Sequence, residues 1–420
     1  MDPARLIFRF GVPMSLPSTP YASTRRTFLV ASGLTALASA RAFGANDNLR
    51  VGVIGAGQRM GTLLDCAEKS GPHTLVAVAD PYKPRYESVL KREAGASATT
   101  HTDYHPILDN KEIDTVFIAT PDHWHVRIAV DALAAGKDVY LEKPVTHTIE
   151  EGEALRKAVR SSKQILQCGM QQRSWSQFRD AVALVQAGNI GRVHQVRTYW
   201  WQNYQHNAGP GSARHAVDQS QLDWKQWLGN APDQPFDSEK FYLWRWYWNF
   251  GGGAMTDLFT HWIDVVQWAM QSDMPSHAFM LGDKYAFPEW DCPDTVQAAF
   301  RYPAGSAMKG EKAAGSGFDV VYEGMMASSI DDGGIEFRGT EATLKVTRSG
   351  MSVYHEGAKE NPVLTEKSTG DGTITHMQNF FECVRSRKEP NAPVEAGIAA
   401  ARAGHIGNLA LHNHGQWSQS

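Results

Sequence analysis

The chain has 420 residues, of which 42% are hydrophobic and 20% charged, and its formal net charge at pH 7 is -4. This length exceeds what one hydrophobic core usually supports, so at least two domains are expected, and the lack of a basic excess argues against nucleic acid as a partner. The 4 cysteines are scattered, without the pairs or Cys/His clusters of a disulfide framework or a zinc site.

Residues 1–48 are predicted to be an export signal and linker rather than part of the fold. Arg25 and Arg26 precede an apolar run over residues 29–40, which small residues follow. This layout is typical of a twin-arginine signal and predicts a periplasmic or otherwise extracytoplasmic protein; a mobile N-terminal tail is the alternative. The run is shorter than the ~20 residues that cross a bilayer, so no stable membrane span is expected.

From residue 49 onward, short apolar stretches alternate with amphipathic ones. Strands are predicted at residues 49–55, 74–80, 114–120, 138–142 and 165–169, and helices at residues 61–70, 124–135 and 148–162. With right-handed crossovers, these elements form a doubly wound parallel sheet of the Rossmann type, to which we assign residues 49–172.

A glycine-rich turn follows the first strand. Gly55 and Gly57 stand where the chain must turn tightly and approach a pyrophosphate, and Gly61 stands where the next helix is expected to pack closely on the strand. The spacing has one residue more than the usual dinucleotide fingerprint, and a purely structural turn is the alternative. The strand before and the helix after favour a nucleotide.

Asp80 ends the second strand and favours NAD as the cofactor. A carboxylate at this position accepts hydrogen bonds from ribose hydroxyls and repels a 2′-phosphate. Lys83 and Arg85 lie close by in sequence, so NADP stays the alternative.

Two further segments end strands at the same edge of the sheet. One contains Thr120, Pro121 and His125, and the other contains Glu142 and Lys143. Because ligands bind outside the carboxyl ends of parallel strands, both segments should line the cofactor cleft. An ammonium there can stabilise a developing alkoxide or shuttle a proton, so Lys143 is the first catalytic candidate; taken alone it would be an ordinary surface lysine.

Over residues 49–412 the chain resembles the Gfo/Idh/MocA family of sugar and inositol oxidoreductases. The features that carry the resemblance are the glycine turn, Asp80, the segment from Thr120 to His125 and the sequence Glu142-Lys143-Pro144. The resemblance implies a second α/β domain with an open, mainly antiparallel sheet, which often packs against another subunit, so a homodimer or homotetramer is expected. It implies that Lys143 lies beside nicotinamide and substrate and that the bond before Pro144 is cis. It also places His125 near the substrate or nicotinamide.

Asp257 and His261 lie four residues apart in a predicted helix after a glycine-rich turn, on one face. His261 suits a general base, and Asp257 can orient it or bind a neighbouring hydroxyl. Without further context such a pair is more often structural, but the resemblance implies contact with the reacting hydroxyl. Metal ligation by both residues together with His123 and His125 is the competing interpretation; no metal is predicted, because the family's dehydrogenases generally work without one.

Gln172 and Arg173 follow the last strand of the first domain, at the expected hinge. An amide and a fixed cation there could bind polar substrate groups. Equally, Arg173 could close a salt bridge between domains.

Residues 173–393 are assigned to a substrate and oligomerisation domain, and residues 394–420 to a C-terminal helix that packs back towards the first domain. Strands are expected at residues 298–302, 306–312, 335–338, 342–347 and 351–355, and closing helices at residues 376–385 and 393–412. Trp244, Trp246 and Trp248 alternate at the period of a strand and could line a sheet face or the cleft.

Together these features predict an NAD(P)-dependent oxidoreductase that moves hydride between a sugar or polyol hydroxyl and a tightly bound cofactor. Free NAD is scarce outside the inner membrane, and the twin-arginine route carries folded proteins, so the cofactor should be loaded before export and stay bound. One alternative is a redox-neutral enzyme that cleaves glycosides by transient oxidation, elimination and re-reduction. Another is a family member that binds sugar without catalysis.

Overall fold

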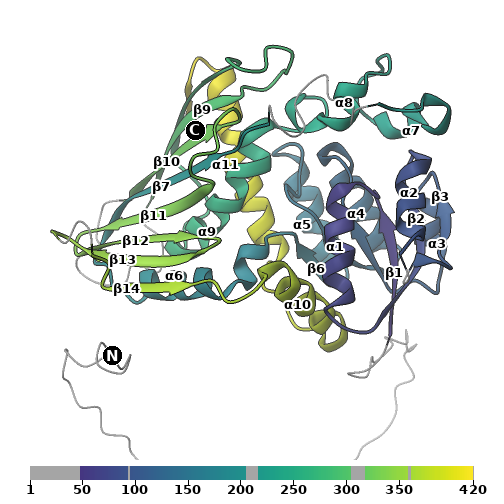
Figure 1. Cartoon of the computed structure of the whole chain (residues 1–420), viewed down its shortest axis with the longest axis horizontal. Coiled ribbons are helices and arrows are strands. Elements are labelled where there is room, and N and C mark those ends of the chain that lie inside the picture. Colours follow the sequence, from purple (N-terminus) through teal and green to yellow (C-terminus); the bar gives the residue numbers. More distant parts are fainter. Residues whose placement is uncertain (1–47, 93–94, 205–215, 304–316, 358–360, 420) are drawn as a thin grey trace, which may run out of the picture. The chain divides into compact units, whose positions relative to one another are not determined.

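The computed structural model describes residues 48–92, 95–204, 216–303, 317–357 and 361–419 (Figure 1). The predicted export signal lies outside the described residues except for Asn48, and so does the strand expected at residues 306–312. Two sheets organise the described part of the chain, one of 6 and one of 9 strands. None of the described helices combines the length and the apolarity needed to span a bilayer.

The six-stranded sheet confirms the doubly wound domain. Its order is β3-β2-β1-β4-β5-β6, and every neighbouring pair is parallel. The strands are β1 (Leu49–Ile54), β2 (His73–Ala79), β3 (Thr99–His101), β4 (Thr115–Ile118), β5 (Asp138–Leu141) and β6 (Leu166–Cys168). Because the strand order reverses between β1 and β4, their carboxyl ends flank the crevice in which such sheets bind ligands.

Helices connect these strands. They are α1 (Gln58–Glu68), α2 (Lys83–Leu90), α3 (His105–Asp109), α4 (His125–Ala134) and α5 (Glu151–Ser161), with a 3-10 turn, η3 (Asp122–Trp124), before α4. In α1, Met60, Leu63 and Leu64 are buried at the spacing of an amphipathic helix. The helix begins before its predicted start because Gly57 already serves as its N-cap. Gly61 therefore lies inside α1.

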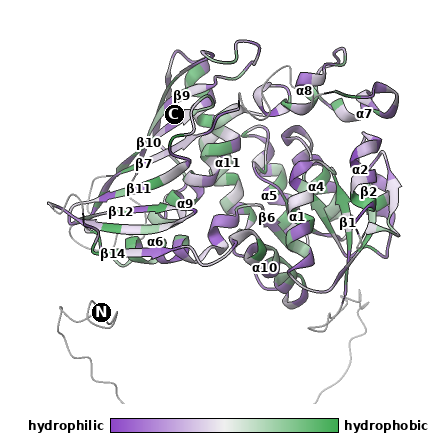
Figure 2. Cartoon of the chain, viewed as in Figure 1, coloured by the Kyte–Doolittle hydropathy of each residue, from purple (hydrophilic) through white to green (hydrophobic). Residues whose placement is uncertain are grey.

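The nine-stranded sheet confirms a mainly antiparallel second domain. Its order is β14-β13-β12-β11-β7-β10-β9-β8-β15, in which β7 and β10 run parallel and the other neighbours antiparallel. The strands are β7 (Val193–Trp201), β8 (His277–Asp283), β9 (Thr295–Tyr302), β10 (Phe318–Met325), β11 (Gly333–Gly339), β12 (Ala342–Thr347), β13 (Gly350–His355), β14 (Leu364–Lys367) and β15 (Gln416–Ser418). Burial alternates along β9 and β10, and Figure 2 shows the matching alternation of hydropathy in this sheet, so one face belongs to the core.

The helices of the second half are α6 (Ser176–Gln186), α7 (Trp224–Leu228), α8 (Ser238–Tyr242), α9 (Thr260–Met270), α10 (Gly372–Ser386) and α11 (Val394–His412), with 3-10 turns η4 (Gln171–Ser174), η6 (Gln219–Gln221) and η7 (Trp244–Trp246). The two closing helices are thus present as α10 and α11. α10 packs against the first domain, where its residues Met377, Phe380 and Phe381 join the hydrophobic core around β1 and α1. The domain boundaries proposed from the sequence stay a prediction.

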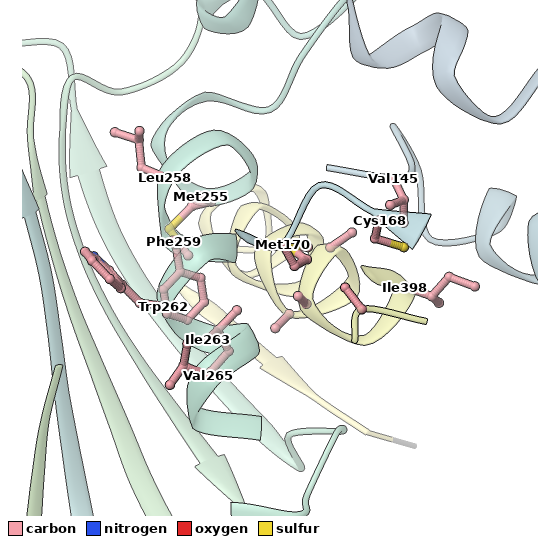
Figure 3. Close-up of a cluster of buried hydrophobic side chains, with 14 of the residues drawn as sticks. Val145, Cys168, Met170, Met255, Leu258, Phe259, Trp262, Ile263, Val265 and Ile398 are labelled. Atoms are coloured by element: carbon pink, nitrogen blue, oxygen red, sulfur yellow. The ribbon is translucent and has the colours of Figure 1, made fainter. Parts of the chain in front are cut away.

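One hydrophobic core runs from the first sheet to the second. Figure 3 shows Val145 and Cys168 from the first domain close to α11, and Met255 and Phe259 on the opposite side of that helix. α11 contacts α9 and β8 on one side and α5 and β6 on the other. A Cβ on Gly397 would come within 2.6 Å of the Cys168 sulfur, so this helix approaches β6 as closely as its backbone allows.

Trp244, Trp246 and Trp248 do not line a sheet face; Trp244 and Trp246 line the cleft instead, which was the other possibility. Residues Trp244–Trp246 form the 3-10 turn η7 directly after α8. Asp237 starts this helical stretch, because its carboxylate accepts hydrogen bonds from the first backbone amides of α8. Trp246 then stacks on Trp290 with ring centroids 4.3 Å apart, and this tertiary contact overrides the local alternation.

The helix that carries Asp257 and His261 also differs from the expectation. It begins with a π-helical turn, η8 (Met255–Phe259), before α9 continues from Thr260. A π-turn holds more residues per turn than an α-helix, so the four-residue spacing does not align the two side chains as predicted. Such turns are frequent at functional sites.

Candidate active site

A cavity of about 1190 Å³ lies at the carboxyl ends of β1, β2, β4 and β5 and is bounded on its other side by residues of the second domain. It exceeds the volume that a drug-sized ligand needs. The predicted cofactor residues on its wall are Gly55, Gly57, Gly61, Asp80, Thr120, Pro121, Glu142 and Lys143. Asp257 and His261 line the same cavity from the other domain.

The glycine turn forms the end of the cavity beside α1. Gly55 has a φ of +82°, and a Cβ there would lie 2.8 Å from the carbonyl oxygen of Ala119. A Cβ on Gly57 would meet nothing within 4 Å. No side chain caps α1, and its first turn holds no acidic residue, so its amides are available to an anion.

Gly61 has a different role from the one expected. A Cβ there would come no closer than 3.6 Å, to Arg92 Nη2, which is an ordinary contact. Close helix-to-strand packing therefore does not explain this glycine. It lines the cavity wall and accepts a hydrogen bond from Arg92 through its carbonyl oxygen.

Asp80 is buried at the end of β2. Its two carboxylate oxygens accept hydrogen bonds from the amides of Ala56 and Tyr82, at 2.8 and 2.9 Å. Burial raises the pKa of this carboxyl, while Arg85, 4.0 Å away, opposes the shift. Each oxygen keeps a lone pair for a ribose hydroxyl. Together with the open space at Gly57 and the uncapped α1, these residues fit a dinucleotide.

Lys143 and Asp257 join the two domains inside the cavity. The Lys143-Pro144 bond is cis, as predicted. Lys143 Nζ donates hydrogen bonds to the Asp257 carbonyl oxygen at 2.8 Å and to its Oδ1 at 2.6 Å. Arg245 Nε donates to the same Oδ1 at 3.0 Å. Burial alone would raise the pKa of Asp257, but Lys143 and Arg245 lower it to about 2. Asp257 is therefore a carboxylate that positions Lys143.

His261 lies beside this network with its ring stacked on Trp200, the centroids 5.6 Å apart. Its Nδ1 is buried and has no hydrogen-bond partner among the described residues. Burial holds the pKa of His261 well below its ordinary value, and nearby Lys143 lowers it further. The imidazole is thus neutral and able to accept a proton. The partners of the Asp257 carboxylate are Lys143 and Arg245, so the expectation that Asp257 orients His261 is corrected.

His125 does not reach the cavity. It is 1% exposed, and its ring nitrogens lie 2.6 Å from the carbonyl oxygen of Pro144 and 3.0 Å from that of Thr120. Burial lowers its pKa to about 4. The expected direct contact with ligand is therefore corrected to a positioning role: His125 braces the two segments that carry Thr120 and Lys143.

Gln172 and Arg173 also lie away from the cavity wall. Gln172 is 1% exposed, whereas its neighbour Gln171 lines the cavity. Arg173 forms a salt bridge with Asp264 of α9 at 2.8 Å and stacks on Trp268. The predicted substrate contacts are thus corrected: Arg173 forms a salt bridge instead, with a residue that lies in the same assigned domain.

The histidines considered for a metal are separated. His123 has its Nε2 3.3 Å from the carbonyl oxygen of Trp227, and His125 faces Pro144 and Thr120. Within residues 48–92, 95–204, 216–303, 317–357 and 361–419, no three His, Cys, Asp or Glu residues gather so that they could hold a metal ion.

Several cavity residues were not predicted as site residues. They include Arg59, Gln171, Trp200, Gln202, Tyr204, Arg245 and Arg348. Arg59 lies inside the glycine turn, so the motif itself marks its position. Arg245 lies between two of the alternating tryptophans, and no local pattern marks Arg348.

A glycine turn built for a dinucleotide, facing a lysine, a carboxylate and a neutral histidine, defines a nicotinamide-dependent oxidoreductase. Residues 49–170 match the profile described as "Oxidoreductase family, NAD-binding Rossmann fold" and residues 217–414 match its "C-terminal alpha/beta domain". The chain belongs to the Gfo/Idh/MocA family.

Its relatives include dehydrogenases of polyols and sugars. The chain is 24% identical to scyllo-inositol 2-dehydrogenase (NAD(+)) of Bacillus subtilis, over 78% of this chain and 86% of that enzyme. A glycosyl hydrolase family 109 protein of Solibacter usitatus is 33% identical, over 26% of this chain and 27% of that protein. A levoglucosan dehydrogenase in complex with NADH and L-sorbose has the same fold, with a TM-score of 0.68, 20% identity, and coverage of 88% of this chain and 98% of that one.

Proposed function

We propose that this protein oxidises a hydroxyl of a sugar or polyol with NAD, or runs the reverse reduction. The observation that carries the proposal is the Lys143–Asp257 pair, which joins the dinucleotide domain to the second domain inside one cavity, next to a neutral His261. The similarity to an NAD-dependent inositol dehydrogenase supports the substrate class.

The residues divide the chemistry between them. When bound, NAD supplies the nicotinamide carbon that accepts the hydride. Gly55, Gly57 and Asp80 would hold its pyrophosphate and ribose. Lys143 donates a hydrogen bond to the reacting oxygen and stabilises the negative charge that develops as hydride leaves. His261 takes the hydroxyl proton at Nε2, because Nδ1 is buried.

The test is spectroscopic. The purified protein is incubated with NAD and a panel of sugars and polyols, and absorbance at the NADH band is followed. Steady NADH accumulation with at least one compound supports the proposal. If NAD and a sugar both bind, no turnover of any kind occurs, and Lys143→Ala leaves binding unchanged, the protein is a sugar-binding member of the family instead.

The second candidate is redox-neutral cleavage of a glycoside. The stretch that is similar to a glycosyl hydrolase family 109 protein favours it, although that match covers only about a quarter of each chain. Release of the aglycone without net NADH would distinguish it from the first candidate.

We further propose that the protein is exported and keeps its cofactor bound. The second domain reaches over the cofactor edge of the first, since Trp124 Nε1 donates to the carbonyl oxygen of Trp227 at 2.9 Å and Arg85 stacks on Phe241. Both contacts support slow release of the cofactor. Denaturing protein from the exported fraction should release a nucleotide that chromatography identifies. An exported protein without nucleotide, unprotected by added NAD, would contradict this.

Self-association through the open face of the second sheet is proposed as well. Phe279 and Leu281 of β8 are 43% and 56% exposed and lie on alternate positions of that strand. Light scattering during size-exclusion chromatography should give the mass of a dimer or tetramer.

A further inference from the structure

Arg348 occupies the two-residue turn between β12 and β13 and lines the cavity from the second domain. The turn is anchored by α6, because Gln177 Nε2 donates hydrogen bonds to the carbonyl oxygens of Thr347 and Arg348, at 3.4 and 3.1 Å. Gln177 is 1% exposed. The backbone that carries Arg348 is therefore fixed from the core.

The guanidinium of Arg348 lies close to the proposed base. Its Cζ is 4.9 Å from the centre of the Trp200 ring, on which His261 also stacks. The Arg348 Nε is buried and has no hydrogen-bond partner in the described part of the chain. Within that part, no carboxylate lies within salt-bridge distance of this guanidinium.

The other cations of the cavity wall have counter-charges. Lys143 and Arg245 share Asp257, and Arg59 pairs with Glu142 at 2.7 Å. Arg85 and Arg92 lie near Asp80 and Asp65. Burial, followed by the repulsion from Arg59, lowers the pKa of Arg348 to about 10, so it is still charged at neutral pH. Asp371 and Asp332 favour the charged form from beyond salt-bridge distance, but neither pairs with the guanidinium. A partly buried cation without a direct ion-pair partner is unfavourable, and an anionic ligand would relieve that.

We propose that Arg348 binds the carboxylate of the substrate, and that the enzyme acts on a sugar acid, a polyhydroxylated carboxylate such as a uronic or aldonic acid. The inference rests on the proposed oxidation of a sugar hydroxyl and narrows its substrate class. A planar guanidinium matches a carboxylate with two parallel hydrogen bonds. The uncapped start of α1 is the place that suits the cofactor pyrophosphate. Arg348, in contrast, packs against Trp200, on which His261 also stacks. The carboxylate would therefore be held beside the reacting carbon.

The experiment compares glucuronate with glucose, which differ only by a carboxylate in place of a hydroxymethyl group. Binding to the NAD-loaded protein is measured by calorimetry. Wild type should bind glucuronate more tightly than glucose. Arg348→Gln should weaken glucuronate binding on the order of 100-fold and leave glucose and NADH binding unchanged. Arg301→Gln is the matched control, since it removes an equally positive group that is 65% exposed and pairs with Asp319 outside the cavity.

Three results would overturn the assignment. They are a preference of wild type for glucose, an equal loss of both ligands in Arg348→Gln, and weaker NADH binding in that variant, which would assign Arg348 to the cofactor. Arg348→Lys keeps the charge and serves if the glutamine variant does not fold; it should retain part of the preference for the acid. Calorimetry measures binding without turnover, so it tests the carboxylate site separately from the proposed function. If the protein binds the acid selectively but oxidises nothing, the proposed function is contradicted and the carboxylate site is supported.

Discussion

Lys143 Nζ lies 2.6 Å from Asp257 Oδ1, and the two side chains are only 10% and 9% exposed. One residue comes from the end of β5 in the first domain and the other from the π-turn of the second. The salt bridge thus holds the catalytic lysine at the seam between the domains. Loss of Asp257 would leave Lys143 as a buried charge without its partner, whereas loss of Lys143 would leave Asp257 paired with Arg245.

Lys143→Met should lower kcat by about 10²–10⁴-fold, because both the charge that stabilises the alkoxide and the hydrogen bond to the reacting oxygen are lost. NADH affinity should change little, since Gly57 and Asp80 are intact. Initial rates and NADH fluorescence titration measure the two quantities. Lys157→Met, on the exposed face of α5, is the control. Unchanged kcat in Lys143→Met would refute its role.

His261→Asn should also lower kcat by about 10²–10⁴-fold, since the proton acceptor is removed. In wild type, the pKa of His261 lies well below 6.5, so protonation should not reduce kcat as the pH falls from 8 to 6.5. A pH profile of kcat tests this. An acidic limb with a midpoint near 6.5 would show that the base is a different group or that the ring is more accessible to solvent than described.

Gly57→Ala should change NADH binding but not stability, whereas Gly55→Ala should lower stability. The methyl group on Gly57 would stand in open cavity space, so NADH binding should weaken by about tenfold, or about 1.4 kcal/mol, with stability unchanged. Gly55 has φ +82° and touches Ala119, so its alanine variant should lose about 1–3 kcal/mol of stability. NADH titration and chemical denaturation separate the effects. Equal behaviour of the two variants would refute the assignment of the turn.

His376 should make stability depend on pH. Burial lowers its pKa from 6.5 to about 4, so its neutral form is favoured in the folded state. The stability it contributes is complete above pH 6.5 and is lost as the pH falls towards 4, by about 2 kcal/mol at pH 5. In His376→Gln the difference in unfolding free energy between pH 7.5 and 5 should shrink by that amount. Replacement of the exposed His277 should leave it unchanged.

Local sequence patterns were sufficient for the first domain. The glycine turn, Asp80 and the two strand-end segments are each contiguous in sequence, and parallel strands bring their carboxyl ends to one edge without further information. The same reasoning found Lys143. Asp257 and His261 lie in the second domain and were predicted from their helical spacing together with the family resemblance.

The errors lie where tertiary contacts decide. Trp246 does not enter a sheet because it stacks on Trp290, and Arg245 turns with it to reach Asp257. His125 follows a cavity-lining segment in the sequence, but its side chain points away from the cavity. Its rotamer and packing decide this direction, and residue spacing does not encode them. Arg348 reaches Trp200 only when the second sheet has formed. No local sequence pattern in the hairpin turns of that sheet shows that they face the cavity.

The last long helix has a bearing on biosynthesis. A Cβ on Gly404 of α11 would lie 2.6 Å from the carbonyl oxygen of Met255, where the π-turn with Asp257 begins, and Gly397 touches β6 on the other side. The spacing between the catalytic lysine and its carboxylate is therefore set by a segment that is translated after both of them. Nascent chains that stop short of α11 would carry every catalytic side chain and still lack the helix that sets the distance between them.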